Sequence, residues 1–446
     1  MSRLILQGLE ARQREGRPIR VGVMGAGEFG RALVTQLAQA PGMLPAAVAD
    51  LDPDLARAAL RAAGYRPEEL RAAESAAAGR DAVAAGAPVV LPDGALLADL
   101  PLDVVVDSTG SAEAGAAVGA RCLRAGQHLV MVNVEADVTV GAALRRLADA
   151  AGVVYTLADG DQPSLICTLA DWAASLGLTV LSGGKGTALY PPDHPRRREV
   201  EAAPEPNLTG VAYMDGTKSQ IEMAAAANAL GWGIDVRGLH HPSARLEEVA
   251  TLFGPRDAGG LFARTPVIDF VNCRSADGET EIEPHLGHGV FVVATGHPEA
   301  LRAMGSKGVP LSADGTRALL WRPFHLVGVE TPFSVAQAVL FGAATGSPLP
   351  EPSVEVVAVA KGDLPAGALL DGIGGRAVRG EAEAAPAAAA ERLLPIGLAD
   401  GVRLARAVPA GTALTFDHLV APGRSACWRL RAEHGLLPPS LPSPPD

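Results

Sequence analysis

Five charged side chains in the middle of the sequence have the types and spacing that proton-transfer chemistry requires. Asp159 and Asp161 occur in the segment DGDQPS, directly after an expected strand and at the start of an expected helix. Lys185 stands among glycines in GGKG, and Lys218 and Glu222 follow in DGTKSQIE. A lysine beside a reacting oxygen can protonate it or stabilise an alkoxide, and a carboxylate can remove a hydroxyl proton. We therefore take these five side chains as candidate catalytic residues.

The candidate residues also have alternative interpretations. If Lys218 opens a helix, Glu222 lies one turn further along the same face, where the two can form an ordinary helix-stabilising ion pair. The glycines around Lys185 are expected to let a substrate phosphate or carbonyl approach closely, although GxxxxGK[ST] is not matched. The carboxylates can instead hold a divalent metal, Mg²⁺ or Mn²⁺, that polarises a hydroxyketone. The metal requirement is therefore open.

The histidines and cysteines indicate metal binding only weakly. His240-His241 and His285…His288 have metal-like spacings, but Gly287 and the strand expected after His288 argue against a rigid helical ligand pair. The four cysteines include no CxxC pair, which argues against a zinc site and a disulfide framework and suits a reducing compartment. The sequence thus names no metal ligands.

A glycine-rich segment near the N-terminus indicates a dinucleotide site. Residues 25–30 read GAGEFG between an expected strand and an expected helix, which is the context that gives GxGxxG its meaning. The first glycine permits the tight turn, the second lets the backbone approach a pyrophosphate, and the third lets helix and strand pack closely. The helix N-terminus offers N–H groups to the phosphates. The expected cofactor contacts in this loop are Gly25, Gly27, Glu28, Phe29 and Gly30.

Further cofactor contacts are expected at the ends of the following strands. Asp50 lies 20 residues beyond Gly30, where an acidic side chain binds the ribose hydroxyls of NAD. A carboxylate there repels the 2′-phosphate of NADP, but Arg57 can offset the repulsion, so both nucleotides are considered. Since ligands of such sheets sit at strand carboxyl ends, further contacts are expected from Ser108, Thr109, Gly110, Asn133 and Glu135. The alternative is a glycine-rich turn that binds no dinucleotide.

The elements that must position these residues alternate in type over the first third of the chain. Strands expected at 19–24, 45–50, 102–107, 127–134 and 153–157 are separated by helical stretches, which implies βαβ units and a mostly parallel sheet. We predict an α/β fold in which a Rossmann doubly wound parallel sheet is followed by a central α+β catalytic domain and a small β-rich SAF-like domain. The expected ranges are 1–157 for the dinucleotide domain, 158–348 for the central catalytic and dimerisation domain, 349–434 for the β-rich domain, and 435–446 for a disordered tail.

Two features mark the C-terminal third. Residues 381–391, EAEAAPAAAAE, are low in complexity and are expected to form a mobile loop. A weak repeat brackets them, because residues 358–373 resemble residues 403–419, with Pro-Ala-Gly elements in both.

Composition limits the classes of partner. A chain of 446 residues with a net charge of −12 is a poor binder of nucleic acid or anionic membranes. The dense basic cluster Arg196–Arg198 is expected in a solvated loop. The first 20 residues lack the apolar core of a signal peptide and suggest a short amphipathic helix, and no apolar run approaches a membrane span. These features favour a cytoplasmic protein with a small-molecule partner.

Longer segments carry a resemblance to known families. The N-terminal layout GAGEFG, DSTGS and VMVNVEAD resembles homoserine dehydrogenases, and GVRLARAVPAGTALTFDHLV near the C-terminus resembles the SAF domain. With NVEADVTVG, GDQPS, GGKG and MDGTKSQIEMA, nearly the whole chain resembles homoserine-dehydrogenase-like oxidoreductases with a C-terminal SAF domain. That group includes type II deoxyxylulose-5-phosphate reductoisomerase-like enzymes.

The resemblance implies an NAD(P)-dependent reductase or reductoisomerase of a small phosphorylated sugar or polyol, such as 1-deoxy-D-xylulose 5-phosphate in isoprenoid biosynthesis. It also implies a homodimer or higher homo-oligomer. Homoserine dehydrogenases carry a lysine after the Asn of their Ala-Asn-Lys segment, whereas Val134 and Glu135 follow Asn133 here, which disfavours homoserine. A homoserine-type amino-acid dehydrogenase and a non-catalytic dinucleotide-sensing protein are the alternatives.

Overall fold

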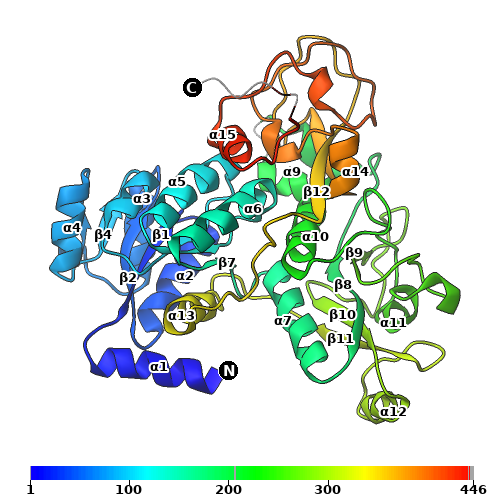
Figure 1. Cartoon of the computed structure of the whole chain (residues 1–446), viewed down its shortest axis with the longest axis horizontal. Helices are drawn as coiled ribbons and strands as arrows, with labels where there is room; N and C mark the ends of the chain where they lie inside the picture. Colours follow the sequence, from blue (N-terminus) through cyan, green and yellow to red (C-terminus); the bar gives the residue numbers. More distant parts are fainter. Residues whose placement is uncertain (1, 205–206, 440, 442–446) are drawn as a thin grey trace. The chain divides into compact units, whose positions relative to one another are not determined.

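The structure, a computed structural model, describes residues 2–204, 207–439 and 441. The chain divides into two compact units, each with its own sheet (Figure 1). The first unit comprises Met1–Ser164 and Leu326–Pro350, and the second comprises Leu165–His325 and Glu351–Asp446.

The first unit is built on a parallel sheet of seven strands in the order β3-β4-β2-β1-β5-β6-β7. Without the edge strand β3, this is the doubly wound order with a switch point between β1 and β5. The predicted α/β Rossmann fold is confirmed. The strands are β1 (Ile19–Met24), β2 (Met43–Ala49), β3 (Arg71–Ala72), β4 (Val89–Leu91), β5 (Val104–Asp107), β6 (His128–Met131) and β7 (Tyr155–Leu157).

Helices cover both faces of this sheet. One apolar core joins the sheet to α1 (Ser2–Arg14), α2 (Glu28–Gln39), α3 (Pro53–Ala62) and α13 (Pro332–Phe341). On the opposite face, α5 (Ala112–Arg124) and α6 (Val134–Ala151) pack on each other and on β5, β6 and β7. The short helix α4 (Ala76–Ala84) packs on β4. The strand expected at 127–134 ends at Met131, and α6 begins at Val134 because Asn133 caps it by accepting the Ala136 N–H.

A late segment of the chain returns to this first sheet. Residues 326–350, of which the sequence suggested 326–348 for the central domain, pack with the first unit, where α13 contacts α1, α2, β6 and β7 (Figure 1). Backbone bonds fix the return, since the Leu157 N–H donates to the Gly346 carbonyl at 2.7 Å. The dinucleotide-binding unit is thus discontinuous in sequence.

The second unit holds a mixed sheet of four strands in the order β11-β10-β8-β9, in which β8 and β9 are parallel. Helix α10 (Thr217–Leu230) packs on β8 and β9. A separate apolar core of this unit contains the aromatic side chains of Phe253, Phe262 and Phe291. The strands are β8 (Thr179–Thr187), β9 (Val267–Asn272), β10 (Val290–Thr295) and β11 (Arg317–Arg322), and the further helices are α7 (Gln162–Ser175), α8 (Pro195–Ala202), α9 (Leu208–Met214), α11 (Val249–Leu252) and α12 (Pro298–Ser306).

The β-rich C-terminal domain belongs to the same second unit. Its strands β12 (Val354–Ala360) and β13 (Val378–Ala384) pair antiparallel, and α14 (Ala385–Ala390) and α15 (Ala426–Glu433) follow. The expected loop at 381–391 is therefore wrong: it forms the end of β13 and then α14. The small residues Gly380 and Ala382 are buried in β13, and Glu381 and Glu383 alternate with them along the strand.

The two repeated segments pair with each other. Leu364 pairs with Val408 and Leu369 with Arg403, both in antiparallel sense. The two repeated segments therefore lie next to each other in the β-rich domain. Of the tail expected to be disordered, residues 440 and 442–446 lie outside the described residues, while the Leu436 N–H donates to the Arg431 carbonyl.

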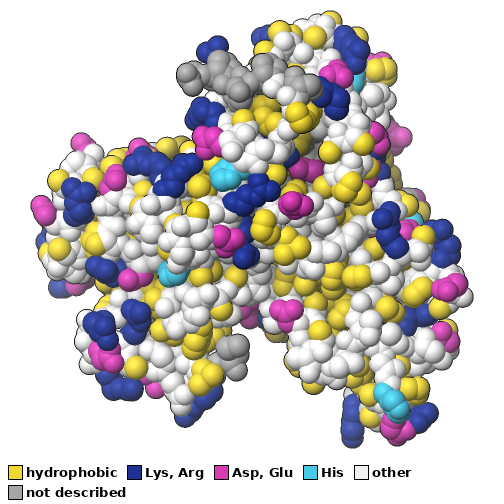
Figure 2. Space-filling model, viewed as in Figure 1, with side chains coloured by type: hydrophobic (Ala, Val, Ile, Leu, Met, Phe, Trp, Pro, Cys, Tyr) yellow, Lys and Arg dark blue, Asp and Glu magenta, His cyan; other side chains and the backbone are white. Residues whose placement is uncertain are grey.

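The surface carries charges of both signs. In the view of Figure 2, Lys and Arg side chains lie scattered among Asp and Glu side chains. Within the part of the chain that the structure describes, no helix has the length and apolar character needed to cross a membrane.

Candidate active site

The glycine-rich loop between β1 and α2 has the shape of a pyrophosphate cradle. Gly25 adopts φ +91°, which favours glycine, and a Cβ on Gly30 would lie 2.0 Å from the Gly25 carbonyl oxygen. A Cβ on Gly27 would meet nothing within 4 Å, so the loop backbone faces open space there. Glu28 and Phe29 are exposed in the first turn of α2. These features fit a dinucleotide phosphate at the start of α2.

Asp50 stands at the rim of this loop, directly after β2. Its Oδ2 accepts the Ala26 N–H at 2.7 Å and its Oδ1 accepts the Asp52 N–H at 2.9 Å. The carboxylate is therefore fixed where the ribose of a dinucleotide would lie. Arg57, which could have offset its charge, bonds instead to Asp54 at 2.6 Å.

Ser108 and Thr109 follow β5 and close the loop from the other side. The Ser108 hydroxyl donates to the carbonyls of Gly25 at 2.9 Å and Met24 at 3.0 Å. Gly110 continues the turn with φ +68°. The structure thus brings the predicted residues of β1 and β5 together at one edge of the sheet.

Asp107 is a buried residue that sequence reasoning missed. Its carboxylate accepts the Thr109 N–H at 2.9 Å, the Thr109 hydroxyl at 2.8 Å and an Asn133 amide N–H at 3.0 Å. Burial raises the pKa of Asp107 to about 6, against the lowering effect of these hydrogen bonds. Asp107 ends a strand of valines in the sequence, and that position was the available sign. It ties the ends of β5 and β6 together, and Glu135 is buried in the next turn.

Asp159 and Asp161 follow β7 in the first unit. The Asp159 N–H donates to the Ser334 hydroxyl at 2.7 Å, and Asp161 accepts the Gln162 N–H at 2.9 Å. Gly160 between them adopts φ +88°. The other three candidate catalytic residues lie in the second unit.

Lys185 and Glu222 form a buried ion pair in the second unit. The Lys185 ammonium lies on β8 and bonds to Glu222 Oε2 on α10. The two residues are only 2% and 1% exposed. The Tyr213 ring lies over the ammonium, with its centroid 5.8 Å from Nζ. A buried pair of this kind fixes one proton donor and one acceptor in a defined geometry away from water.

The glycines around Lys185 have a different role from the one expected. They lie within β8, which runs on to Thr187, rather than after it. A Cβ on Gly183 would lie 3.0 Å from the Trp232 ring, and one on Gly184 would lie 1.8 Å from the Asp269 carbonyl oxygen. The expectation of room for a ligand is therefore wrong, because protein atoms fill the space and the glycines let β8 pack closely on β9 and on the Trp232 ring.

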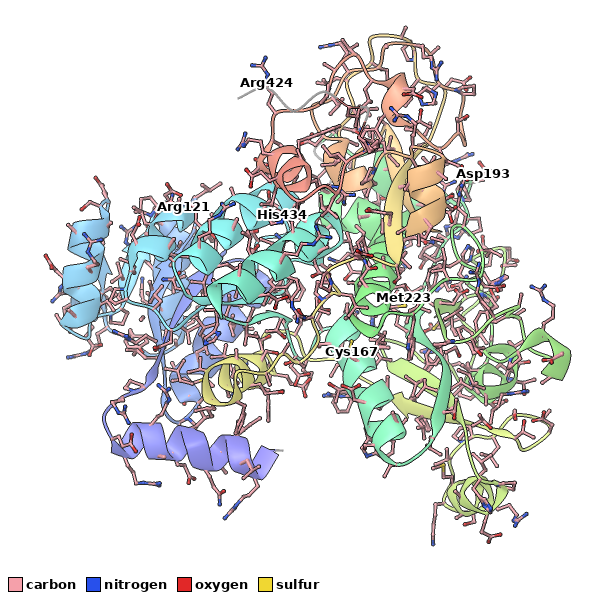
Figure 3. All side chains as sticks on the ribbon, in the orientation of Figure 1. Arg121, Cys167, Asp193, Met223, Arg424 and His434 are labelled. Atoms are coloured by element: carbon pink, nitrogen blue, oxygen red, sulfur yellow. The ribbon has the colours of Figure 1, made fainter. Side chains whose placement is uncertain are left out.

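The segment around Lys218 joins the central part to the C-terminal domain. Lys218 is half-buried in the first turn of α10. Beside it, Asp215 pairs with Lys361 at 2.7 Å, and the Thr217 hydroxyl accepts the Gly380 N–H at 2.8 Å. Figure 3 shows the side chains of this unit, with Met223 labelled further along α10. The predicted motif DGTK is thus a junction as well as a candidate site.

A cavity of about 630 Å³ opens beside this junction. Its lining includes Tyr190, Arg197, Asp215, His241, Arg379 and Glu381. The loop expected at Arg196–Arg198 is wrong, because these residues lie in α8. Arg196 and Arg198 are exposed, as expected, but Arg197 is buried with its Nε 3.0 Å from Glu201. Pro195 at the first helical position and the i,i+4 spacing to Glu201 were the available signs.

One group of side chains has the spacing of a metal site. Among the described residues, the only three ligating atoms of His, Cys, Asp or Glu that approach one another within 4.8 Å belong to Glu281, Glu283 and His285. Both glutamates are exposed, so this cluster by itself indicates no metal.

Three sequence families match successive parts of the chain. Residues 25–158 match "Homoserine dehydrogenase, NAD binding domain", and residues 160–331 match "Oxidoreductase DRL, catalytic domain". The chain is an oxidoreductase. Residues 355–420 match "SAF domain", so the oxidoreductase combines an NAD-binding domain, a catalytic domain and a SAF domain. No curated protein sequence matches the chain significantly.

Solved structures share only a distant likeness. A probable dehydrogenase from Thermotoga maritima is 13% identical, with 73% of this chain and 90% of that chain covered and a TM-score of 0.40. A myo-inositol dehydrogenase from Lactobacillus casei, in complex with NAD(H) and myo-inositol, is 14% identical over 62% and 71%, with a TM-score of 0.35. A DOX-P reductoisomerase in complex with magnesium is 15% identical over 47% and 57%, with a TM-score of 0.34. Likenesses this distant carry no argument about activity.

Proposed function

We propose that this oxidoreductase is an NAD(P)-dependent reductase or reductoisomerase of a small phosphorylated sugar or polyol, such as 1-deoxy-D-xylulose 5-phosphate. The observation that carries the proposal is the buried Lys185–Glu222 pair inside the part of the chain that matches an oxidoreductase catalytic domain. Reduction of a carbonyl places negative charge on its oxygen, and a buried ammonium stabilises that charge far better than water does.

The chain's own residues supply proton transfer and orientation in this proposal. Lys185 protonates the substrate oxygen, and Glu222 holds the ammonium in place by accepting a hydrogen bond from it. Lys218 is proposed as a second oxyanion contact, and Asp159 and Asp161 are proposed as acid–base groups. If a rearrangement precedes reduction, the same lysines stabilise an enediolate and the carboxylates move the hydroxyl proton.

The nucleotide is proposed to be NAD, with NADP as the alternative. The fixed carboxylate of Asp50 supports this, because it can accept hydrogen bonds from ribose hydroxyls and repels a 2′-phosphate. A bound nicotinamide dinucleotide supplies the hydride. Phosphate contacts are assigned to the Gly25–Gly30 loop, with Ser108, Thr109, Gly110, Asn133 and Glu135 flanking the nicotinamide half.

We also propose a homodimer or higher homo-oligomer in the cytoplasm that binds neither nucleic acid nor membranes. The net charge of −12 supports the last part. A divalent metal, Mg²⁺ or Mn²⁺, is included in the proposal as a cofactor to be tested.

The deciding experiment follows oxidation of NADH and of NADPH by the purified full chain with 1-deoxy-D-xylulose 5-phosphate, with and without Mg²⁺ or Mn²⁺. Turnover with product isomerisation supports the reductoisomerase, and turnover of a phosphorylated polyol without isomerisation supports the reductase. Intact nucleotide binding without turnover of any phosphorylated sugar or polyol would reject the substrate class. Loss of turnover on metal removal by EDTA, restored by Mg²⁺ or Mn²⁺, would add the metal to the mechanism.

A further inference from the structure

The cavity in the second unit is lined by two domains that the sequence keeps apart. Tyr190, Arg197 and Asp215 come from the catalytic domain, while Arg379 and Glu381 come from strand β13 of the SAF domain. The cavity lies where β8 and β9 end, since Asn272 closes β9 and bonds to the Leu189 N–H after β8 at 3.0 Å. Its volume of about 630 Å³ is in the range of small-ligand sites.

Strand β13 is fixed against the catalytic domain by hydrogen bonds that its backbone N–H groups donate to side chains of α10. The Gly380 N–H donates to the Thr217 hydroxyl at 2.8 Å, and the Ala382 N–H donates to Gln220 Oε1 at 2.9 Å. Both acceptors lie in the first two turns of α10. Because residues 379 and 381 alternate with these anchored residues, their side chains share the face that lines the cavity.

The charges around the cavity favour an anion. Among the described residues, five cations and three carboxylates either line the cavity or contact a side chain that lines it. The cations are Arg196, Arg197, Arg274, Lys361 and Arg379, and the carboxylates are Glu201, Asp215 and Glu381. A local excess of positive charge stands out in a chain of net charge −12. A guanidinium has five N–H donors, and Arg197 and Arg379 use only part of theirs on Glu201, the Tyr190 carbonyl and Glu381.

A strained loop supplies a further part of the wall beside β13, because the Gly238 N–H donates to the Ala382 carbonyl at 2.9 Å. Leu239 and His241 adopt φ of +64° and +36°, which is unusual for residues with side chains. The buried carboxylate of Asp269 holds this loop by accepting the His240 N–H at 2.8 Å and the His241 N–H at 3.0 Å. The loop delivers His241 and Ser243 to the cavity, and strain maintained by surrounding bonds is concentrated at functional sites.

We propose that this cavity binds the phosphate group of the substrate, with Arg197 and Arg379 as its cationic contacts. The SAF domain then supplies a specificity-determining residue rather than acting as an appended module. The inference deepens the proposed function and rests on it for the rest of the ligand. Hydroxyl and amide groups of Tyr190, Ser243 and Asn272 complete a surface suited to a phosphorylated polyol.

The test measures binding of inorganic phosphate to the full chain by calorimetric titration, saturated with NADH so that the glycine loop is occupied. Arg379→Gln should weaken phosphate binding by about 10-fold to 100-fold, because a charge-assisted contact is lost. Arg379→Lys should restore part of the affinity. Arg406→Gln removes an exposed arginine of the same domain and should leave the affinity unchanged.

The outcomes separate this inference from the proposed function. Wild-type protein that binds no phosphate, or Arg379→Gln that binds it as tightly as wild type, would overturn the cavity assignment. If phosphate binding depends on Arg379 but no phosphorylated sugar or polyol is turned over, the phosphate site stands and the proposed reaction fails. Turnover with a KM insensitive to Arg379→Gln would keep the reaction and reject the site. Unchanged NADH affinity and circular dichroism show that the variant is folded.

Discussion

Lys185 and Glu222 neutralise each other in a place that water does not reach. Taking both charges out of water is costly, and the geometry of their contact must offset that cost. Such a pair is weak evidence of stabilisation by itself, so a catalytic use gives a reason for its presence. The two roles can be separated by substitution.

Removing the lysine charge tests both roles. Lys185→Met leaves Glu222 as an uncompensated buried charge, and we expect the free energy of unfolding to fall by about 3–5 kcal/mol. We expect kcat to fall by about 100-fold or more, because the proton donor is lost, with NADH affinity unchanged. Denaturant unfolding and steady-state kinetics measure the two effects.

The double variant Lys185→Met/Glu222→Leu is the matched control. Replacing both charges by apolar groups should recover most of the stability while activity stays lost. A double variant that turns over within a few-fold of wild type would mean that the pair serves folding alone.

The carboxylate of Asp50 is predicted to set the preference for NADH over NADPH. Asp50→Ser removes the carboxylate that is fixed at the rim of the glycine loop, so we expect kcat/KM for NADH to fall by about 10-fold and the preference for NADPH to rise. Comparing the two nucleotides in wild type and variant measures it. A wild-type enzyme that already prefers NADPH would contradict the role assigned to this residue.

Residue types and spacing predicted some of these residues and missed others. The glycine loop, Asp50 and Lys185 stood out because each breaks an apolar pattern at a strand. Arg379 did not, because it lies beside a low-complexity stretch and its strand packs on α10, where Thr217 lies 163 residues before Gly380. No local pattern reports such a contact. Asp107 was passed over although it ends a strand, because its network involves residues up to 26 positions on.

At the scale of elements, the contact between α10 and β13 depends on very small clearances. A Cβ on Gly380 would lie 2.8 Å from Val356 Cγ1 and 3.0 Å from Thr217 Cγ2. The strand can therefore approach the helix only with glycine at this position. The hydrogen bond from the Gly380 N–H to Thr217 then sets the register of the strand against the helix.

Thr217→Val keeps the shape of the side chain and removes the acceptor. A buried N–H is left without its partner, and we expect the free energy of unfolding to fall by about 1–3 kcal/mol. Hydrogen exchange at the Gly380 amide should accelerate, which mass spectrometry of peptides from 378–384 can follow. Thr295→Val, at the end of β10, is the control. Unchanged exchange in Thr217→Val would show that packing alone fixes the strand.

Buried strands were the elements that the sequence predicted best. The bounds of β1 agree, and those of β5 and β7 differ by two residues or fewer at each end, because runs of valine, leucine and isoleucine leave few alternatives. The segments 381–391 and 196–198 were misassigned as loops, because alanine-rich and arginine-rich stretches carry little periodicity. Their order comes from tertiary contacts, such as those of Glu383 and Glu391 with Arg237.

The whole molecule contains several buried carboxyl groups with raised pKa values. Burial raises the pKa of Asp107 and Asp269 to about 6 and that of Asp137 to about 7. Because these values lie above those of the unfolded chain, the folded protein binds protons more tightly between about pH 4 and 7. Stability from these groups is present at low pH and is lost as pH rises through the folded pKa.

Asp137→Asn isolates one of these groups. The Tyr155 hydroxyl donates to Asp137 Oδ1 at 2.7 Å, and the amide oxygen of asparagine can accept the same bond. The unfolding free energy of the variant relative to wild type should rise with pH between about 4 and 7, by up to about 1.4 kcal/mol per pH unit. Guanidinium unfolding at three pH values measures this. Parallel pH curves for Asp137→Asn and wild type would contradict it, and Asp149→Asn, an exposed carboxylate on the same helix, is the control.

The return of residues 326–350 to the first unit has a consequence during synthesis. The ribosome makes β7 well before α13, and at about 5–20 residues per second the intervening 174 residues take roughly 10 to 35 seconds. Throughout that interval the apolar face that Val335 and Ala336 later cover is exposed on the nascent chain. The second unit in turn awaits residues beyond 351. Neither unit can therefore complete its fold while the middle of the chain is being translated, and the first unit can do so before the second.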